Sequence, residues 1–450
     1  MKMKYITRTV WILSVISLFT DMASEMLYPI MPIYLKSIGF TIFLIGILEG
    51  AAEATAGLSK GYFGKLSDSL ERRAPFVQLG YSLSAIAKPM MAIFIHPIGI
   101  FIARTMDRFG KGIRTGARDA ILSDEATPQT KGKIFGFHRS MDTLGAVIGP
   151  LFALIYLSYY PENYTTLFLI AFIPGLMAIA SSFLIKDKKK GRVEDFISEE
   201  GRAYSDKNQR ENISSAFSQN ESNPSNKNED VENIEDRNDE TSSGINSNER
   251  IKIPSIFSFL KYWKTSPALY KKIVIGLLAF TLFNSSDLFL LLRIKDAGLN
   301  DTSVIGVYIF YNLIYALVSF PLGMLADKIG LKKVLVGGLI IFAIVYFGMS
   351  INSSIYYYLF LFLLYGIYAA ATEGISKAWI SNITDKKDTA TAIGTFTAFQ
   401  SIFTMIASSL AGFIWYEFGA QVLFISTALA VVCVVLYFLL AVNKTTLIVE

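Results

Sequence analysis

The chain has 450 residues, of which 52% are hydrophobic, 14% are aromatic and 18% are charged. Soluble domains carry about 25% charged residues, so this composition excludes a soluble enzyme, a disordered scaffold and a secreted disulfide-rich module. The net charge of +5 and the single Cys433 give no reason to expect nucleic-acid binding or a disulfide framework. With a mean hydropathy of +0.43, the sequence predicts an integral membrane protein that is embedded in the lipid bilayer.

Apolar runs long enough to cross a bilayer, which takes about 20 residues per helix, follow one another along most of the chain. The first run follows Lys2, Lys4 and Arg8 as a signal peptide would. However, Asp21 and Glu25 stand where a cleavage site should lie, so we expect a retained helix. The twelve predicted spans lie near 10–36, 42–64, 75–95, 97–118, 133–158, 163–185, 271–293, 303–325, 333–352, 355–378, 390–415 and 420–442.

Lysine and arginine collect in the loops on one side of these spans, which predicts a multi-pass protein of the cytoplasmic cell membrane with both termini cytoplasmic. Between about 192 and 250 the chain is rich in Asn, Ser, Glu and Asp, with few aromatic residues. Such a segment buries too little apolar surface to offset the entropy lost on ordering. We therefore expect an N-terminal six-helix bundle over 1–185, a disordered cytoplasmic linker over 186–265 and a C-terminal six-helix bundle over 266–450. The linker is either a simple tether or a regulatory segment.

The two halves repeat each other at a nearly constant spacing. Gly64 and Gly323 are 259 residues apart, and Gly136 and Gly394 are 258 residues apart. Both pairs fall at matching places among the predicted spans. The constant offset predicts a parallel internal repeat, an architecture in which two helical bundles are related by an axis along the membrane normal.

The loops after the second and eighth spans share the pattern Gly-x-Leu-x-Asp followed by a basic pair, and the fourth span contains Arg108-Phe-Gly-Lys-Gly. These patterns resemble motifs A and B of the major facilitator superfamily, which the chain resembles throughout apart from the linker. The resemblance implies an all-α membrane protein with twelve transmembrane helices in two pseudo-symmetric six-helix bundles. The strings at 107–119 and 135–145 resemble a prokaryotic branch of undefined substrate.

A third pattern, in the fifth span, resembles motif C, which is associated with antiporters. Close packing against another helix is expected there, because glycines four residues apart allow near approach and a proline bends the helix. The match departs at its end, where Ala153-Leu154 replaces a glycine pair. The helix-packing residues are Gly136, Gly145, Gly149 and Pro150.

The loop aspartates of motif A are expected to act as latches. Asp68 and Asp327 would accept hydrogen bonds from neighbouring helix N-termini and pair with the basic residues that follow. The alternative is a simple turn whose basic residues fix topology. The predicted gating residues are Gly64, Asp68, Arg72, Arg73, Gly323, Asp327, Lys332 and Lys333.

Ionisable residues inside membrane spans are costly and are functional candidates by default. In the fourth span they recur every three or four residues, which places them on one helical face, and the first two spans offer carboxylates nearby. This set is interpreted as a proton-coupling network, with a static ion-pair network as the alternative. Its members are Asp21, Glu25, Glu49, Glu53, Arg104, Asp107, Arg108, Lys111, Asp287, Glu373 and Lys377, while Arg114 and Arg118 extend the same face.

Polar and aromatic residues in the second half are candidates for contacts with a small-molecule substrate. Aromatic side chains in spans also pack or anchor the helix at the interface, so packing is the alternative for each tyrosine. The predicted cavity residues are Asn284, Tyr311, Asn312, Tyr315, Tyr365 and Gln400.

Taken together, these patterns predict a secondary transporter that works by alternating access, with proton-coupled export as the first hypothesis. Proton-coupled uptake of a small anion and a non-transporting membrane sensor are the alternatives. Two distant histidines, one cysteine and the lack of a phosphate-binding Gly-x-x-x-x-Gly-Lys loop predict no metal site, no cofactor and no enzymatic activity. We expect a monomer with no nucleic-acid partner.

Overall fold

The computed structural model describes residues 6–28, 31, 34–35, 38–39, 42–94, 96–161, 163–187, 258–299, 301–351 and 353–442. Helices are the regular structure throughout this part of the chain. The first half contains α1 (Arg8–Glu25), α3 (Ile42–Ser69), α4 (Ala74–Ile93), α5 (Pro97–Asp124), α6 (Lys131–Tyr159) and α7 (Tyr164–Ser182). The second half contains α9 (Ser258–Thr265), α10 (Ala268–Phe283), α11 (Leu288–Asp296), α12 (Asp301–Ile329), α13 (Leu331–Met349), α14 (Ile355–Asn382), the 3₁₀ turn Lys386–Asp388, α15 (Thr389–Phe418) and α16 (Ala420–Leu440).

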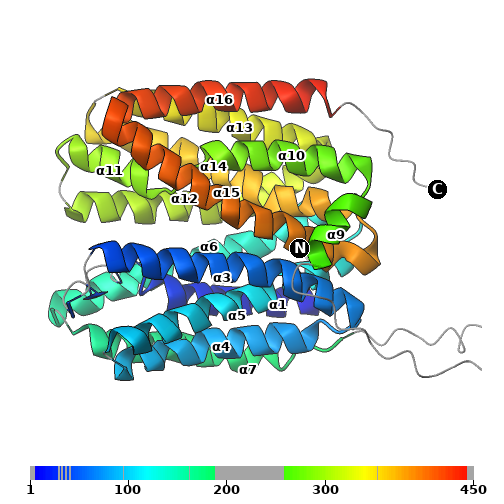
Figure 1. Cartoon of the computed structure of the whole chain (residues 1–450), viewed down its shortest axis with the longest axis horizontal. Helices are drawn as coiled ribbons and strands as arrows, with labels where there is room; N and C mark the ends of the chain where they lie inside the picture. The colour runs from blue at the N-terminus through cyan, green and yellow to red at the C-terminus, as the bar shows by residue number, and fades with distance from the viewer. Residues whose placement is uncertain are drawn as a thin grey trace, which may run out of the picture. The chain divides into compact units, whose positions relative to one another are not determined.

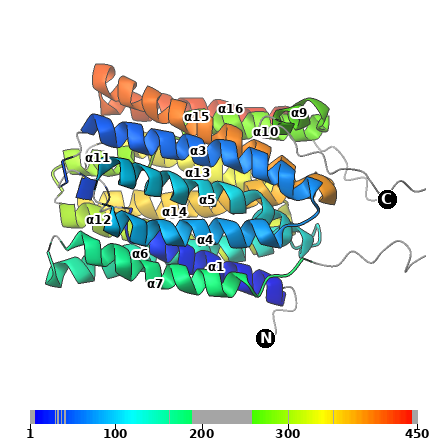
Figure 2. The same cartoon turned by 60° about the horizontal axis from the view of Figure 1, so that its bottom comes forward.

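The helices run side by side in two bundles, α1–α7 in the lower half of Figure 1 and α10–α16 in the upper half. The turned view in Figure 2 shows the same alignment of the long helices. Between the bundles, α6 packs along α12 and α3 packs along α15. The loops 70–73, 125–130 and 383–388 lie at one end of the helices, which we call the basic end.

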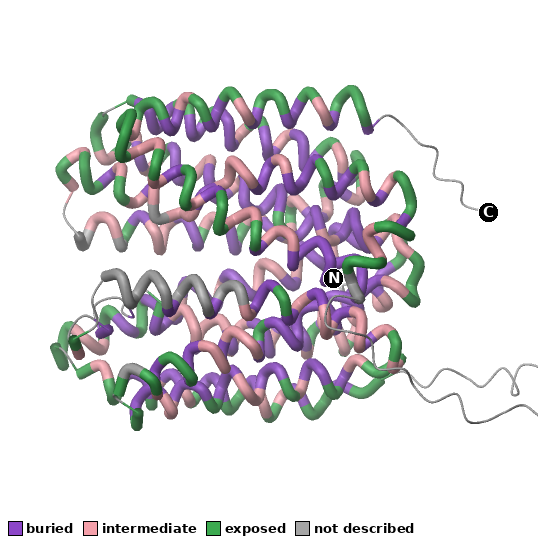
Figure 3. Tube along the Cα trace, viewed as in Figure 1, coloured by how far each residue is buried: buried purple, intermediate pink, exposed green. Residues whose placement is uncertain are grey.

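The outer surface of the bundles is strongly apolar. Figure 3 shows exposed residues along the outward faces of the helices and buried residues between them. Leu317 and Leu429, for example, are 61% and 63% exposed. Seven helices in the described residues are long and apolar enough to cross a membrane, namely α6, α7 and α12–α16. Large exposed apolar surface on long apolar helices fits a lipid environment.

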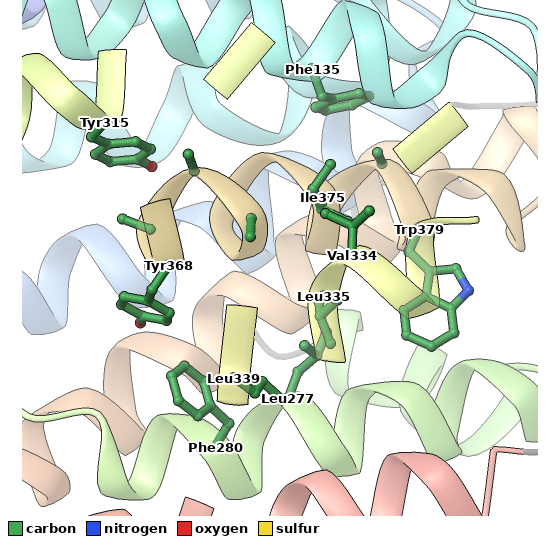
Figure 4. Close-up of a cluster of buried hydrophobic side chains, with 14 of the residues drawn as sticks. Phe135, Leu277, Phe280, Tyr315, Val334, Leu335, Leu339, Tyr368, Ile375 and Trp379 are labelled. Atoms are coloured by element: carbon green, nitrogen blue, oxygen red, sulfur yellow. The ribbon is translucent and has the colours of Figure 1, made fainter. Parts of the chain in front are cut away.

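The core of the C-terminal bundle is a cluster of aromatic and aliphatic side chains (Figure 4). Leu277 and Phe280 of α10 meet Leu335 of α13 and Tyr368 of α14 in it, so three helices share one core. Phe135 of α6 lies against the same cluster, which therefore continues across the bundle interface.

The predicted seventh span is not continuous, which corrects the sequence prediction of one helix over 271–293. The chain forms α10 and α11 with a break from Asn284 to Asp287. Asn, Ser and Asp side chains compete with the helix for backbone hydrogen bonds, and here the backbone N–H of Ser286 donates to Ser408 Oγ at 3.2 Å. The predicted first span, 10–36, is also interrupted: α1 ends at Glu25, residues 26–28 form a turn, and residues 31, 34 and 35 are helical again.

The end of the predicted linker is also corrected. Residues Ser258–Thr265, which we had assigned to it, form the short helix α9. Helix α9 contacts α3 of the first half and α15 of the second. The remainder of the predicted linker, 188–257, lies outside the described residues, so its predicted disorder stays a prediction.

The internal repeat extends to backbone conformation. Gly39 and Gly298, 259 residues apart, have φ angles of +93° and +92°. Gly330 in the second motif A loop has φ +104°, and the residue 259 positions earlier is Glu71, with φ +52°. Glycine adopts positive φ at no steric cost, whereas a side chain there is strained. The first motif A loop therefore also has a residue at positive φ, but this residue is Glu71 and not a glycine.

Candidate functional site

A small polar cavity lies inside the N-terminal bundle, between α1 and α5. Its volume of about 20 Å³ is enough for one water molecule. The lining contains three acidic and four basic side chains, so opposite charges balance almost completely. The lining residues are Asp21, Ser24, Glu25, Tyr28, Arg104, Asp107, Arg108, Lys111 and Arg114. Most of the predicted coupling network on α1 and α5 is thus brought together, while the side chains of Glu49 and Glu53 lie outside the described residues.

Asp107 is the centre of the most deeply buried charges. Its carboxylate lies 3.4 Å from Lys88 Nζ of α4 and 3.8 Å from an Arg104 nitrogen. Lys88 Nζ also donates to the Ser84 carbonyl at 2.9 Å, and Ser84 Oγ accepts a hydrogen bond from Arg114 at 2.7 Å. Lys88 is 2% exposed. Sequence reasoning missed it, although it is the one charged residue of the span predicted at 75–95.

A second group of charges joins the two bundles. Arg139 of α6 binds Asp142 on the same helix at 2.7 Å and Glu373 of α14 at 2.6 Å, and it also donates to the Tyr315 hydroxyl of α12. Asp21 of α1 and Asp142 of α6 lie on facing turns of these two packed helices, because Ser17 and His138, one turn earlier on each helix, are 3.4 Å apart (Oγ to Nε2). Arg139 therefore links the carboxyl pair of the N-terminal bundle to two helices of the C-terminal bundle.

Nearer the basic end, Lys377 of α14 binds Asp119 of α5 at 2.8 Å. Asp119 also pairs with Arg118 at 2.9 Å, and Arg118 donates to Ser17 of α1 at 3.2 Å. Arg118 thus contributes to the bundle interface and is not part of the cavity lining. Sequence reasoning did not select Asp119, Arg139 or Asp142 as site residues. The acid–base pair at positions i and i+3 of the fifth span was the available signal for the last two.

The C-terminal bundle presents tyrosines where the N-terminal bundle presents charges. Asp287, in the break between α10 and α11, accepts a hydrogen bond from the Tyr365 hydroxyl at 2.7 Å. Tyr311 lies against Tyr365 and Tyr315, with ring centroids 5.1 and 6.1 Å apart. Asn312 is buried and donates to the Tyr308 carbonyl of its own helix at 3.0 Å.

A second cavity of about 70 Å³ lies in the C-terminal bundle. Its polar lining includes Asn284, Glu373, Lys377 and Gln400, with aromatic side chains around them. Two of these, Glu373 and Lys377, are also the C-terminal partners of the ion pairs between the bundles. The cavity and the bundle interface therefore share charged groups.

Both motif A aspartates contact a helix N-terminus of the opposite bundle. Asp68, at the end of α3, accepts hydrogen bonds from the backbone N–H and hydroxyl of Thr391 in α15, at 2.6 and 2.7 Å, and pairs with Arg73 at 3.3 Å. Asp327, at the end of α12, accepts from the backbone N–H groups of Gly132 and Lys133 in α6, at 2.7 and 2.9 Å. A helix N-terminus favours a carboxylate because its N–H groups are unpaired and its dipole is positive there.

The basic pairs after these aspartates behave differently in the two copies. Arg73 pairs with Asp68, as predicted, and also with Asp124, whereas Arg72 is exposed. The expectation that Asp327 pairs with Lys332 and Lys333 is wrong, because Lys332 Nζ donates to the Val442 carbonyl and Lys333 is exposed. The side chain that approaches Asp327 is Lys133, at 4.0 Å. The basic residues that follow α12 are not near Asp327, so the cation closest to Asp327 is Lys133 of α6.

The repeat glycines meet across the bundle interface. A Cβ on Gly64 would lie 2.5 Å from the Ala390 carbonyl oxygen and 3.4 Å from Gly394 Cα, and Gly323 faces Gly132 and Gly136 in the same way. Such contacts leave no space for a side chain. By contrast, Gly149 packs within its own bundle, where a Cβ would lie 2.5 Å from the Met22 carbonyl of α1. Gly145 likewise faces α1, and Pro150 lies inside α6.

The sequence matches the family model described as Major Facilitator Superfamily over residues 13–311 and 294–447. The chain belongs to this superfamily. It is 30% identical over 416 residues to an MFS-type transporter of Methanocaldococcus jannaschii, covering 91% of this chain and 89% of that protein. The superfamily resemblance expected from the motifs is thereby confirmed.

Two further similarities concern parts of the chain and the fold. The quinolone resistance protein NorA of Staphylococcus aureus is 24% identical over 170 residues, which cover 37% of this chain and 42% of NorA. The crystal structure of the human organic anion transporter MFSD10 superposes with a TM-score of 0.67 at 12% identity, covering 96% of this chain and 99% of MFSD10. The predicted twelve-helix fold in two bundles is confirmed, and the protein is a multi-pass membrane transporter by family.

Proposed function

We propose that this superfamily member exports a small solute in exchange for protons, by alternating access of the two bundles around their interface. It would act as a monomer in the cytoplasmic membrane, with both termini and the basic end cytoplasmic, as the distribution of lysine and arginine in the loops favours. The observation that carries the proposal is the set of ion pairs from Asp142 through Arg139 to Glu373, with Asp21 on the facing turn of α1, because it connects acidic side chains of the N-terminal bundle to the contact between the bundles.

Proton binding follows from the chemistry of the carboxyl pair. Asp21 and Asp142 lie on facing turns of α1 and α6, and two carboxylates close together repel each other when both are ionised, so this pair is suited to hold one proton. Release of that proton would leave two adjacent negative charges beside Arg139. Arg139 would then be drawn toward them and away from Glu373, which weakens the contact between the bundles.

Glu25 is the other proton carrier that we propose, because it lines the charged cavity with Arg108 and Lys111. Arg108 cannot deprotonate, so a movement of α5 that changes its distance from Glu25 would change the affinity of Glu25 for a proton. The latches at Asp68 and Asp327 are made in this structure, so the basic end is closed in it. Opening of that end requires both latches to break.

Export is favoured over uptake by the partial similarity to NorA, whose name refers to quinolone resistance, and by the motif C resemblance. Uptake of a small anion together with protons is the second candidate. Four of the charged side chains that line the N-terminal cavity are cations, namely Arg104, Arg108, Lys111 and Arg114, and a cationic lining suits an anionic substrate.

One experiment distinguishes proton-coupled export from proton-coupled uptake, because the transported probe accumulates in opposite compartments in the two cases. The protein is reconstituted into liposomes with an imposed pH gradient, and radiolabelled norfloxacin, p-aminohippurate and glucose are offered as zwitterionic, anionic and neutral probes. Proton antiport accumulates the transported probe in the acidic compartment, and proton symport accumulates it in the alkaline compartment. Accumulation of a probe that does not depend on the pH gradient would contradict the proposed proton coupling, whereas a sensor would accumulate none of the probes.

A further inference from the structure

An apolar groove lies on the outer side of the C-terminal bundle, between α10 and α16. Its volume is about 390 Å³, within the range of about 300–1,000 Å³ typical of ligand pockets. It is lined by Ile275, Gly276, Ala279, Phe283, Ala430, Cys433, Val434 and Tyr437. Ile275 is 48% exposed and Cys433 is exposed. Because α16 is one of the helices long and apolar enough to cross a membrane and α10 packs against it, the open side of the groove faces the acyl chains of the bilayer.

Gly276 accounts for part of this shape. A Cβ at this position would lie 2.6 Å from Phe438 Cζ and 2.9 Å from Tyr437 Cε1. The two rings therefore lie directly against the backbone of α10. Ala279 and Ala430 are also small, and the larger Ile275 and Phe283 complete the lining contributed by α10.

One end of the groove reaches a basic corner of the molecule. Lys272 is exposed and precedes Ile275 and Gly276 by three and four residues, so it lies on the same face of α10. The Tyr437 hydroxyl donates to the Lys272 carbonyl at 2.9 Å, which places this end of the groove next to Lys272. Lys271 Nζ donates to the Lys264 carbonyl at 2.8 Å, so α9 ends beside the same turn.

The same corner offers further attraction for an anion. Helix α10 begins after Pro267 and has no side-chain cap, so the N–H groups of its first turn and the positive end of its dipole lie beside the three lysines. Within the part of the chain that the structure describes, no carboxylate pairs with Lys264, Lys271 or Lys272. The corner is therefore a patch of three lysines that make no salt bridge among the described residues.

We propose that the groove and the corner together bind one anionic phospholipid. The phosphodiester headgroup lies at Lys272 and the N-terminus of α10, and one acyl chain occupies the groove as far as Phe283. A soluble anion would use only the corner, and a neutral lipid only the groove. The direct continuity of the two parts along one face of α10 is what selects an anionic lipid. The site is separate from the proton path and does not depend on the direction of transport.

The single cysteine of the chain is a reporter within this groove. The purified full-length protein is reconstituted in dioleoyl-phosphatidylcholine alone or with dioleoyl-phosphatidylglycerol, and the rate at which N-ethylmaleimide modifies Cys433 is measured by mass spectrometry. We expect phosphatidylglycerol to slow modification about tenfold, which corresponds to about 1.4 kcal/mol of preferential binding. Equal rates in the two lipids would overturn the proposal.

Three variants separate the parts of the site. Lys272→Gln should abolish the protection by phosphatidylglycerol. The control variant Lys328→Gln removes an exposed lysine at the C-terminal end of α12, and it should retain the protection. Ala279→Trp should fill the groove and reduce the amount of phosphatidylglycerol that copurifies with the protein, measured by native mass spectrometry. If Lys328→Gln loses protection as fully as Lys272→Gln, the effect is general surface charge and the site is wrong. If Ala279→Trp folds and retains its lipid, the acyl chain is not in the groove.

Discussion

The two bundles share a backbone plan and differ in the chemistry they place around their interface. The N-terminal bundle carries paired charges around Asp107 and the Asp21–Asp142 carboxyl pair. The C-terminal bundle carries a stack of tyrosines around Asp287. We propose that the two bundles have different roles. The N-terminal bundle carries the protons, and the C-terminal bundle makes most of the contacts with the solute.

The largest effect is expected where buried charge is most concentrated. Asp107→Asn leaves Lys88 and Arg104 without their carboxylate, and breaking a buried ion pair from one side costs about 3–5 kcal/mol. We expect a clear fall in the melting temperature of the purified protein and loss of transport. Lys88→Met combined with Asp107→Asn should recover part of the stability. If the single variant melts like the wild type, the cluster is not an energetically coupled unit.

The next prediction compares the acids of the two bundles directly. Glu25→Gln removes a proposed proton carrier, so pH-driven accumulation should fall by at least about tenfold, the effect of losing about 1.4 kcal/mol, while downhill exchange persists. Asp287→Asn keeps an oxygen that accepts from Tyr365, so its effect on coupling should be much smaller. The measurement is solute accumulation with and without a pH gradient. Equal loss of coupling in both variants would contradict the proposal that the N-terminal bundle alone carries the protons.

The two latches should also differ. Asp68→Asn loses the ion pair with Arg73 as well as part of its hydrogen bonding to Thr391, whereas Asp327→Asn mainly weakens bonds from two backbone N–H groups. Loss of about 1 kcal/mol from a closed gate changes its population about fivefold. We expect both variants to fold and insert while transporting more slowly, Asp68→Asn the more so. If both variants transport at the wild-type rate, Asp68 and Asp327 contribute to membrane topology and not to gating.

A smaller effect is expected in the turn after Asp68. Glu71→Gly gives the first motif A turn the residue that Gly330 supplies in the second, which removes the strain of a side chain at positive φ, about 1 kcal/mol. We expect a small rise in melting temperature. Gly330→Glu is the reciprocal variant and should lower it. An unchanged melting temperature in both would indicate that the two turns are not under the strain that their φ angles imply.

No effect on transport is expected from replacing residues 200–250 by a shorter Gly/Ser chain, because a tether supplies reach and no contacts. The measurement is flux at matched protein insertion. A replaced linker that inserts normally and fails to transport would show that this segment has a gating role or a specific partner.

Much of this architecture is readable from sequence because it depends on local patterns. Apolar runs give the spans, and the constant offset between Gly64 and Gly323 gives the repeat. The ion pairs between bundles were not predicted, because the contacts of Arg139 with Glu373 and of Asp119 with Lys377 join positions more than 200 residues apart. The break at Asn284–Asp287 was missed because apolar residues on both sides maintained the hydropathy of a single span.

The most direct test of the central claim is accumulation by a variant in which the N-terminal acids Asp21, Glu25, Glu49 and Glu53 are all replaced by their amides. It is measured in proteoliposomes under an imposed pH gradient, with whichever probe the wild-type protein accumulates. Our account predicts that the variant folds and exchanges this probe downhill but no longer accumulates it. Undiminished accumulation would contradict it and would leave Asp142, the C-terminal bundle or another ion to carry the coupling.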